Sequence, residues 1–97
     1  MISRAEIMEA RAEYIKNHGA IVEKAADDFA TKYFETIKDV GSVDVENNDN
    51  TGNEPDDIIR DYYEGASVDR NLVVKAFGRL GLYVEDFKTY FTIGFKP

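Results

Sequence analysis

The sequence predicts an α+β fold in which helices cover one face of a small antiparallel sheet. Apolar residues recur at spacings of three and four over the first third of the chain and in two shorter segments, which indicates helices. Near residue 44 and at the end of the chain, apolar and polar residues alternate instead, which indicates strands. The length of 97 residues fits a single domain covering 1–97.

The first predicted element is a long helix. Ser3 followed by Glu6 matches a capping box, and an apolar heptad seam follows. One alternative is a single helix over residues 4–38, straight or kinked near Gly19, about 50 Å long. The other is a pair of helices separated at 17–19, with Gly19 as the C-terminal cap of the first. The heptad phase continues across Gly19, which favours one helix.

A helix of that length would protrude from a domain whose radius of gyration implies a width of about 26 Å. It would then need a partner helix, so we expect a homodimer. Its interface would use the seam residues Met8, Ile15, Val22, Phe29 and Tyr33.

The middle of the chain predicts a strand, a loop and a helix. The helical pattern stops at Asp39-Val40-Gly41, and Val43 and Val45 then alternate with acidic residues as in a half-buried strand. A polar loop follows over 47–53. Pro55 suits the first residue of a helix, and the acidic residues around it favour a helix N-terminus. This helix ends at Gly65.

The last third predicts a helix and a hairpin. The helix is capped by Ser67 or Asp69 and ends before Gly81, and its buried positions are Leu72, Val73, Ala76, Phe77 and Leu80. Its remaining surface carries Arg70, Lys75 and Arg79. Two strands over 82–85 and 89–95 then form the C-terminal hairpin. We therefore expect two shorter helices after the long one and about three strands.

Charge is divided unevenly along the chain. The net charge is −7, but residues 39–69 carry ten acidic side chains and one basic one, while the remainder is slightly basic. A divided field can steer a cationic partner. Direct binding of nucleic acid is not expected, because it requires a basic footprint that the sequence does not obviously supply. A helix-turn-helix centred on Gly19 is rejected, because its second helix, over 20–34, would be net acidic.

Catalysis is not expected from this composition. The chain has no cysteine and one histidine, His18, which suits a helix C-terminus better than a triad. The acidic middle fails as a Ca²⁺ loop: with Gly52 at position six, Asn47, Asp49 and Thr51 fill donor positions, but Ile58 stands where the bidentate glutamate belongs. We expect no metal and no cofactor.

The compartment expected from the sequence is the cytoplasm. The absence of cysteine suits a reducing compartment. The N-terminal residues are charged throughout and contain no apolar run of signal-peptide length, and no segment has the roughly 20 apolar residues that span a membrane. A membrane partner is not expected.

The acidic middle is the predicted site. Carboxylates one helical turn apart could copy the charge ladder of a DNA duplex, and an aromatic anchor beside them is typical of binding hot spots. The predicted partner-binding residues are Asp44, Glu46, Asp49, Glu54, Asp56, Asp57, Asp61 and Glu64, with Tyr62 or Tyr63 as anchor. The expected partner is a basic protein such as a DNA-binding protein or a nuclease.

In size and charge division the chain resembles phage-encoded inhibitors of host DNA-binding proteins or nucleases. The resemblance is one of composition and implies a DNA mimic that occupies the partner's DNA-binding surface. The alternative hypothesis is a homo-oligomeric structural or adaptor protein assembled through the N-terminal helix, in which the acidic region only keeps the chain in solution.

Overall fold

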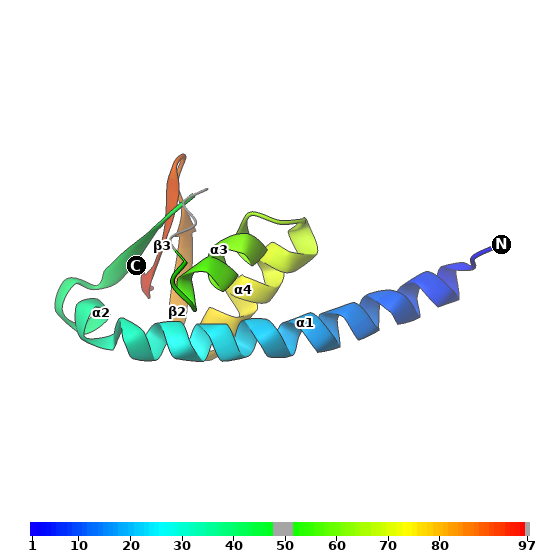
Figure 1. Cartoon of the computed structure of the whole chain (residues 1–97), viewed down its shortest axis with the longest axis horizontal. Coiled ribbons are helices and arrows are strands. Elements are labelled where there is room, and N and C mark those ends of the chain that lie inside the picture. Colours follow the sequence, from blue (N-terminus) through cyan, green and yellow to red (C-terminus); the bar gives the residue numbers. More distant parts are fainter. Residues whose placement is uncertain (48–51, 97) are drawn as a thin grey trace.

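A computed structural model describes residues 1–47 and 52–96. In these ranges the chain forms α1 (Arg4–Lys32), α2 (Phe34–Val40), β1 (Ser42–Glu46), α3 (Asp56–Tyr63), α4 (Ser67–Arg79), β2 (Leu82–Asp86) and β3 (Tyr90–Phe95) (Figure 1). The predicted α+β class, the long N-terminal helix and the small antiparallel sheet with a C-terminal hairpin are confirmed.

Helix α1 is continuous through Gly19. The Ser3 side chain caps it by accepting a hydrogen bond from the Glu6 backbone N–H at 3.2 Å, as the capping box predicts. Its 29 residues span about 44 Å. The helix ends at Lys32 and not at residue 38, because Tyr33 leaves helical geometry with φ −106° and ψ 15°. A separate short helix, α2, takes the remaining residues.

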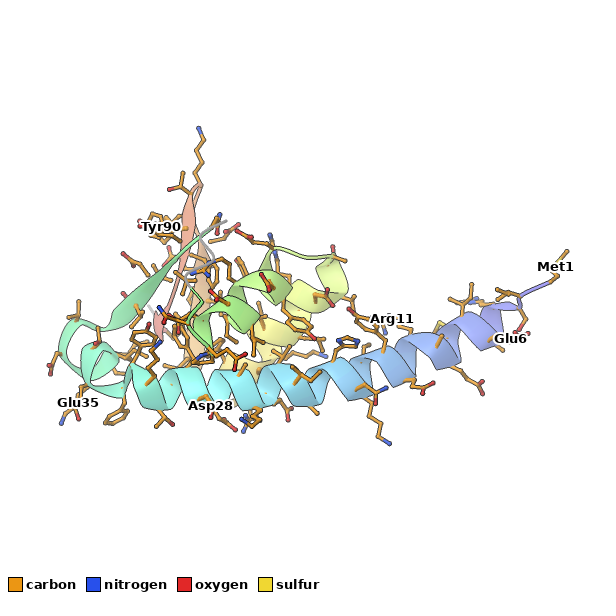
Figure 2. All side chains as sticks on the ribbon, in the orientation of Figure 1. Met1, Glu6, Arg11, Asp28, Glu35 and Tyr90 are labelled. Carbon is orange, nitrogen blue, oxygen red and sulfur yellow. The ribbon has the colours of Figure 1, made fainter. Side chains whose placement is uncertain are left out.

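Helix α1 packs against the rest of the chain from Tyr14 onwards. Helices α3 and α4 lie beside its middle, and the sheet lies towards the α2 end (Figure 1). Residues 1–13, which we call the arm, are all exposed. Figure 2 shows Met1 and Glu6 on this segment, away from the other elements. The molecule is therefore elongated, with extents of 54 × 25 × 25 Å.

The sheet has the order β1-β3-β2, with both neighbouring pairs antiparallel. Gly41 ends α2 with a φ of 96°, a left-handed conformation that favours glycine. The chain then enters β1, where Ser42 lies opposite Gly94 of β3. A Cβ atom at Gly94 would lie 2.1 Å from the Gly41 carbonyl oxygen. The two strands can approach this closely only because residue 94 has no side chain.

The core lies where α1, α3, α4 and one face of the sheet meet. Its largest fully buried side chains are Phe29, Phe77, Phe91, Ile59, Ile93, Val22 and Val73. The rings of Phe29 and Phe77 meet edge to face with centroids 5.6 Å apart, a preferred geometry for aromatic pairs. The predicted inward positions of α4 are confirmed at Leu72, Val73, Ala76 and Phe77, whereas Leu80 is 37% exposed.

This core changes the predicted dimer interface. Val22 and Phe29 are completely buried inside their own chain, so their place in that interface is wrong. Ile15 and Tyr33 are half-buried against the same core. Met8 is 53% exposed and lies on the arm. The heptad seam therefore describes mostly the face that α1 turns towards its own domain.

The hairpin β2–β3 forms without a turn glycine. The Phe87 backbone N–H donates to the Tyr90 carbonyl oxygen at 2.9 Å, and the two rings stack with centroids 4.8 Å apart. Side-chain stacking thus supports a turn that lacks the glycine usually found in tight hairpins. Among the helices of residues 1–47 and 52–96, none combines the length and apolar character needed to cross a membrane.

Candidate functional site

Helices α3 and α4 are joined by a three-residue turn, Glu64-Gly65-Ala66. Two helices joined by three or four residues that include a glycine are the components of a helix-turn-helix. A Cβ atom at Gly65 would lie 2.8 Å from the Asp69 carboxylate and 3.4 Å from the Asp61 carbonyl oxygen. The turn therefore has little room for a side chain, and it sets α4 directly against the end of α3.

Contacts from three directions fix α4 in place. Its apolar side faces the core, and the Leu72 side chain lies against α1 at Gly19, where a Cβ atom would be 3.8 Å from it. Near its N-terminus, Asp69 accepts a hydrogen bond from the Tyr14 hydroxyl at 2.6 Å. On the hairpin side, the Arg70 guanidinium lies over the Tyr63 ring and its Nε donates to the Tyr63 carbonyl oxygen at 3.0 Å. The orientation of α4 is therefore set by α1 and α3 together.

The outward face of α4 is basic. Three of its exposed residues are cationic and none is acidic. The exposed residues of α4 are Ser67, Arg70, Asn71, Val74, Lys75, Gly78 and Arg79. At about 100° per residue, positions 71, 74 and 78 share the middle of this face. Arg70 falls on one side of that middle, and Lys75 and Arg79 fall on the other.

The three cations form only exposed ion pairs, or none, among the described residues. Arg79 lies 2.8 Å from Asp27 of α1, with both side chains about half exposed. Arg70 lies 3.8 Å from Asp86 of β2. Lys75 has no ion pair in the part of the chain that the structure describes. Exposed ion pairs contribute about 0–1 kcal/mol, so an external anion could replace Asp27 or Asp86 at little cost.

A polar cluster joins α1 to α3 and α4 at the base of the arm. His18 Nδ1 lies 2.7 Å from the Tyr62 hydroxyl, and the His18 ring stacks on Tyr14 with centroids 4.0 Å apart. The hydrogen bond to Asp69 raises the pKa of Tyr14 above its ordinary value, because ionisation would place two negative charges together. Burial raises the pKa of Tyr62. His18 is thus inside a continuous helix, and its predicted place at a helix C-terminus is wrong.

The predicted acidic site is divided by the fold. Asp57 accepts a charge-assisted hydrogen bond from the Arg60 Nη1 at 2.7 Å, and the Arg60 Nε donates to the Glu46 carbonyl oxygen at 2.6 Å. Asp56 is bound by Lys32 at 3.0 Å and by the Tyr33 hydroxyl. The Asp56 carboxylate therefore holds α3 against α1, and Asp57 pairs with the Arg60 side chain that binds β1. The predicted ladder of Asp57, Asp61 and Glu64 on one free face is not formed.

The predicted aromatic anchor is also placed differently. Tyr63 is 4% exposed and stacks on Phe91 with centroids 4.1 Å apart, so its prediction as an anchor is wrong. Tyr62 is half-buried and its hydroxyl meets His18. The remaining predicted acidic residues are exposed on β1, on α3 and at its two ends: Asp44, Glu46, Glu54, Asp61 and Glu64. Asp49 lies outside the described residues.

A metal centre is not found in ranges 1–47 and 52–96, where no group of three histidine, cysteine or carboxylate residues could hold an ion. The Ca²⁺ loop tested in the sequence falls partly outside these ranges. No protein-family model, curated protein or solved structure matches the chain.

The sequence contains a signal for the basic face that charge counting hides. Both predicted helices and the Gly65 between them are visible in the pattern, and so are Arg70, Lys75 and Arg79. The net charge of the residues outside 39–69 counts these three cations together with many acidic residues, so it is only slightly positive. Spacings of five and four place them on one half of the helix surface only when the helix itself is considered.

Proposed function

We propose that this chain is a non-enzymatic domain that binds duplex DNA through the outward face of α4. The observation that carries the proposal is the three-residue Glu64-Gly65-Ala66 turn, which is followed by a helix whose exposed side chains are basic or polar apart from Val74. In a DNA-binding helix-turn-helix, the second helix enters the major groove. Arg70, Asn71, Lys75 and Arg79 are side chains that contact phosphates or base edges.

The order of elements supports the same proposal. A helix-turn-helix followed by an antiparallel hairpin is the layout of winged DNA-binding domains, and here the hairpin β2–β3 packs beside α4. Its turn carries Lys88 and the exposed ring of Phe87. The hairpin would approach the DNA backbone next to the groove that α4 occupies.

The net charge of −7 does not oppose local binding. Affinity for the phosphate backbone depends on how many phosphates the contacting face neutralises. The exposed face of α4 offers three cations and no carboxylate, whereas the exposed carboxylates of the described residues lie outside α4, six of them on α1. Fewer contacts and an acidic remainder predict weak, strongly salt-dependent binding by one copy.

Assembly of two copies would strengthen such binding. The arm exposes Ile2, which precedes α1, and Ile7 and Met8 on its first turns, at 69%, 59% and 53%. Helix-turn-helix proteins commonly bind as dimers to two half-sites. We therefore keep the homodimer as part of the proposal, with Met8 as the interface residue retained from the sequence prediction. Sedimentation of the wild type against Met8→Glu tests this assembly.

The second candidate function is capture of a basic protein by the acidic surface, including DNA mimicry. It is favoured by Asp44, Glu46, Glu54 and Asp61, which are exposed and form no ion pair within the described residues. Reversing the charges of Asp44, Glu46 and Asp61 should abolish binding to a purified basic DNA-binding protein while leaving duplex binding unchanged. Unchanged capture by this variant would remove the candidate. Either function would operate in the cytoplasm.

The proposed DNA binding is tested by fluorescence anisotropy with a labelled duplex at increasing NaCl concentration. Lys75→Ala should weaken binding and reduce the slope of log affinity against log salt by about one. Lys24→Ala is the matched control, because it removes the same charge from an exposed site on α1 beside Asp28. Equal effects of the two variants, or no binding of duplex by the wild type, would overturn the proposal.

A further inference from the structure

The middle of the outward face of α4 differs in kind from its edges. Asn71, Val74 and Gly78 have short side chains or none, and they lie between the long side chains of Arg70 and Lys75. Flanking cations of this length can reach phosphates while the middle of the helix approaches the groove between them. We infer that Asn71, Val74 and Gly78 form a base-reading surface that prefers A·T base pairs, an inference that rests on the proposed DNA binding.

Gly78 has no structural role that explains it. A glycine within a helix destabilises that helix relative to alanine. A Cβ atom built at Gly78 meets nothing within 4 Å, and Gly78 is not among the glycines with a left-handed backbone. Neither packing nor backbone conformation therefore requires glycine here. The remaining reason for glycine at this position is that it lets an external group approach the helix backbone closely.

Asn71 and Val74 supply complementary contacts. The side chain of Asn71 is exposed and makes no hydrogen bond within the described residues. An asparagine amide can donate to adenine N7 and accept from adenine N6, which is a standard bidentate contact in the major groove. Val74 is 45% exposed at the centre of a basic face, where burial of an apolar side chain by a thymine methyl group is favourable. Both contacts select A·T over G·C.

The cationic edges position this surface without reading sequence. Arg70 is held over Tyr63 by its Nε hydrogen bond, and its side chain is 46% exposed and lies near Asp86 of the hairpin. Lys75 and Arg79 lie along the side of α4 that faces α1. Contacts to phosphate fix the register of a protein on the duplex and carry no sequence information directly. Loss of an edge residue and loss of a middle residue should therefore have different signatures.

The first test is selection of bound duplexes from a pool with a randomised central segment, carried out in parallel with the wild type, Asn71→Ala and Lys75→Ala. The wild type should enrich an A·T pair at a fixed position. Asn71→Ala should lose about tenfold of that discrimination while its salt slope stays that of the wild type. Lys75→Ala should keep the preference and bind all duplexes more weakly.

The second test uses Gly78→Leu, which adds bulk to the middle of the face. Because the site is open and leucine is a good helix former, this variant should melt at or above the wild-type temperature, yet it should lose binding. Thr36→Leu is the matched control on the exposed surface of α2 and should keep wild-type binding.

The outcomes separate the inference from the proposed function. If the wild type binds duplexes without sequence preference, or if Asn71→Ala keeps the preference, or if Gly78→Leu binds normally, the base-reading surface is refuted and DNA binding stands. If no duplex is bound and the protein instead retains RNA or a basic protein, both the inference and the proposed function fail.

Discussion

Replacement of Gly94 by alanine tests the packing of the sheet most severely. A Cβ atom there would lie 2.1 Å from the Gly41 carbonyl oxygen and 2.6 Å from the Ser42 Cα. Both are backbone atoms, and the Gly41 oxygen also accepts a hydrogen bond from the Phe95 N–H at 2.9 Å. Relief therefore requires β1 to move away from β3, which would break this bond and disturb the register.

The expected loss of unfolding free energy follows from the atoms that the new Cβ atom would contact, because both belong to the backbone. Extra carbon in a packed core costs typically about 1–3 kcal/mol when side chains can adjust, so we expect about 3 kcal/mol or more at Gly94. For a domain of this size, each kcal/mol lowers the melting temperature by about 4–8 °C, which predicts a decrease of about 12–24 °C.

The assay is thermal unfolding followed by circular dichroism, with Gly78→Ala as the matched glycine control. Nothing lies within 4 Å of a Cβ atom at Gly78, and alanine stabilises a helix relative to glycine by about 0.5–1 kcal/mol. The two identical substitutions should therefore shift the melting temperature in opposite directions. A Gly94→Ala variant that melts with the wild type would refute the close approach of β1 and β3.

Three further predictions concern the core and the base of the arm. Phe77→Ala should lower the free energy of unfolding in urea by about 3–5 kcal/mol, because Phe77 is fully buried. Burial and the bond to Asp56 raise the pKa of Tyr33 above 10.0. The stability that Tyr33 contributes is therefore complete below pH 10 and is lost as the pH rises through the folded pKa. In urea titrations at alkaline pH, Tyr33→Phe should lose less unfolding free energy with rising pH than the wild type does. Tyr14→Phe, which removes the hydrogen bond to Asp69, should speed amide hydrogen exchange in residues 4–14 and leave exchange in α4 unchanged, and an unchanged arm would contradict its anchoring by Tyr14.

Local patterns determined most of the fold that could be read from the sequence. The capping box at Ser3, the left-handed glycine at Gly41 and the alternation around Val45 act within a few residues, so each element was predictable. The break at Tyr33 was not, because no glycine or proline marks it and the apolar pattern continues across it. The break at Tyr33 between α1 and α2 depends on the packing of α2 against β1, which is a tertiary contact.

The site was less predictable because charge alone does not reveal partners. Asp56 and Asp57 look free in the sequence, but Lys32 is 24 positions away from Asp56 and its ion pair depends on the fold. Tyr62 and Tyr63 are adjacent and differ by about 100° around α3, so one faces the core and the other His18. Pattern reading could assign the helix but not which of its two tyrosines faced inward.

The helix-turn-helix interpretation is tested most directly by titrating the isotope-labelled protein with a short duplex and following the backbone amide signals by NMR. DNA binding through α4 predicts chemical-shift changes at Asn71, Val74, Lys75 and Gly78, with smaller changes at the β2–β3 turn. Shifts confined to the acidic residues of β1 and α3, or no shifts at the duplex concentration where anisotropy saturates, would contradict it.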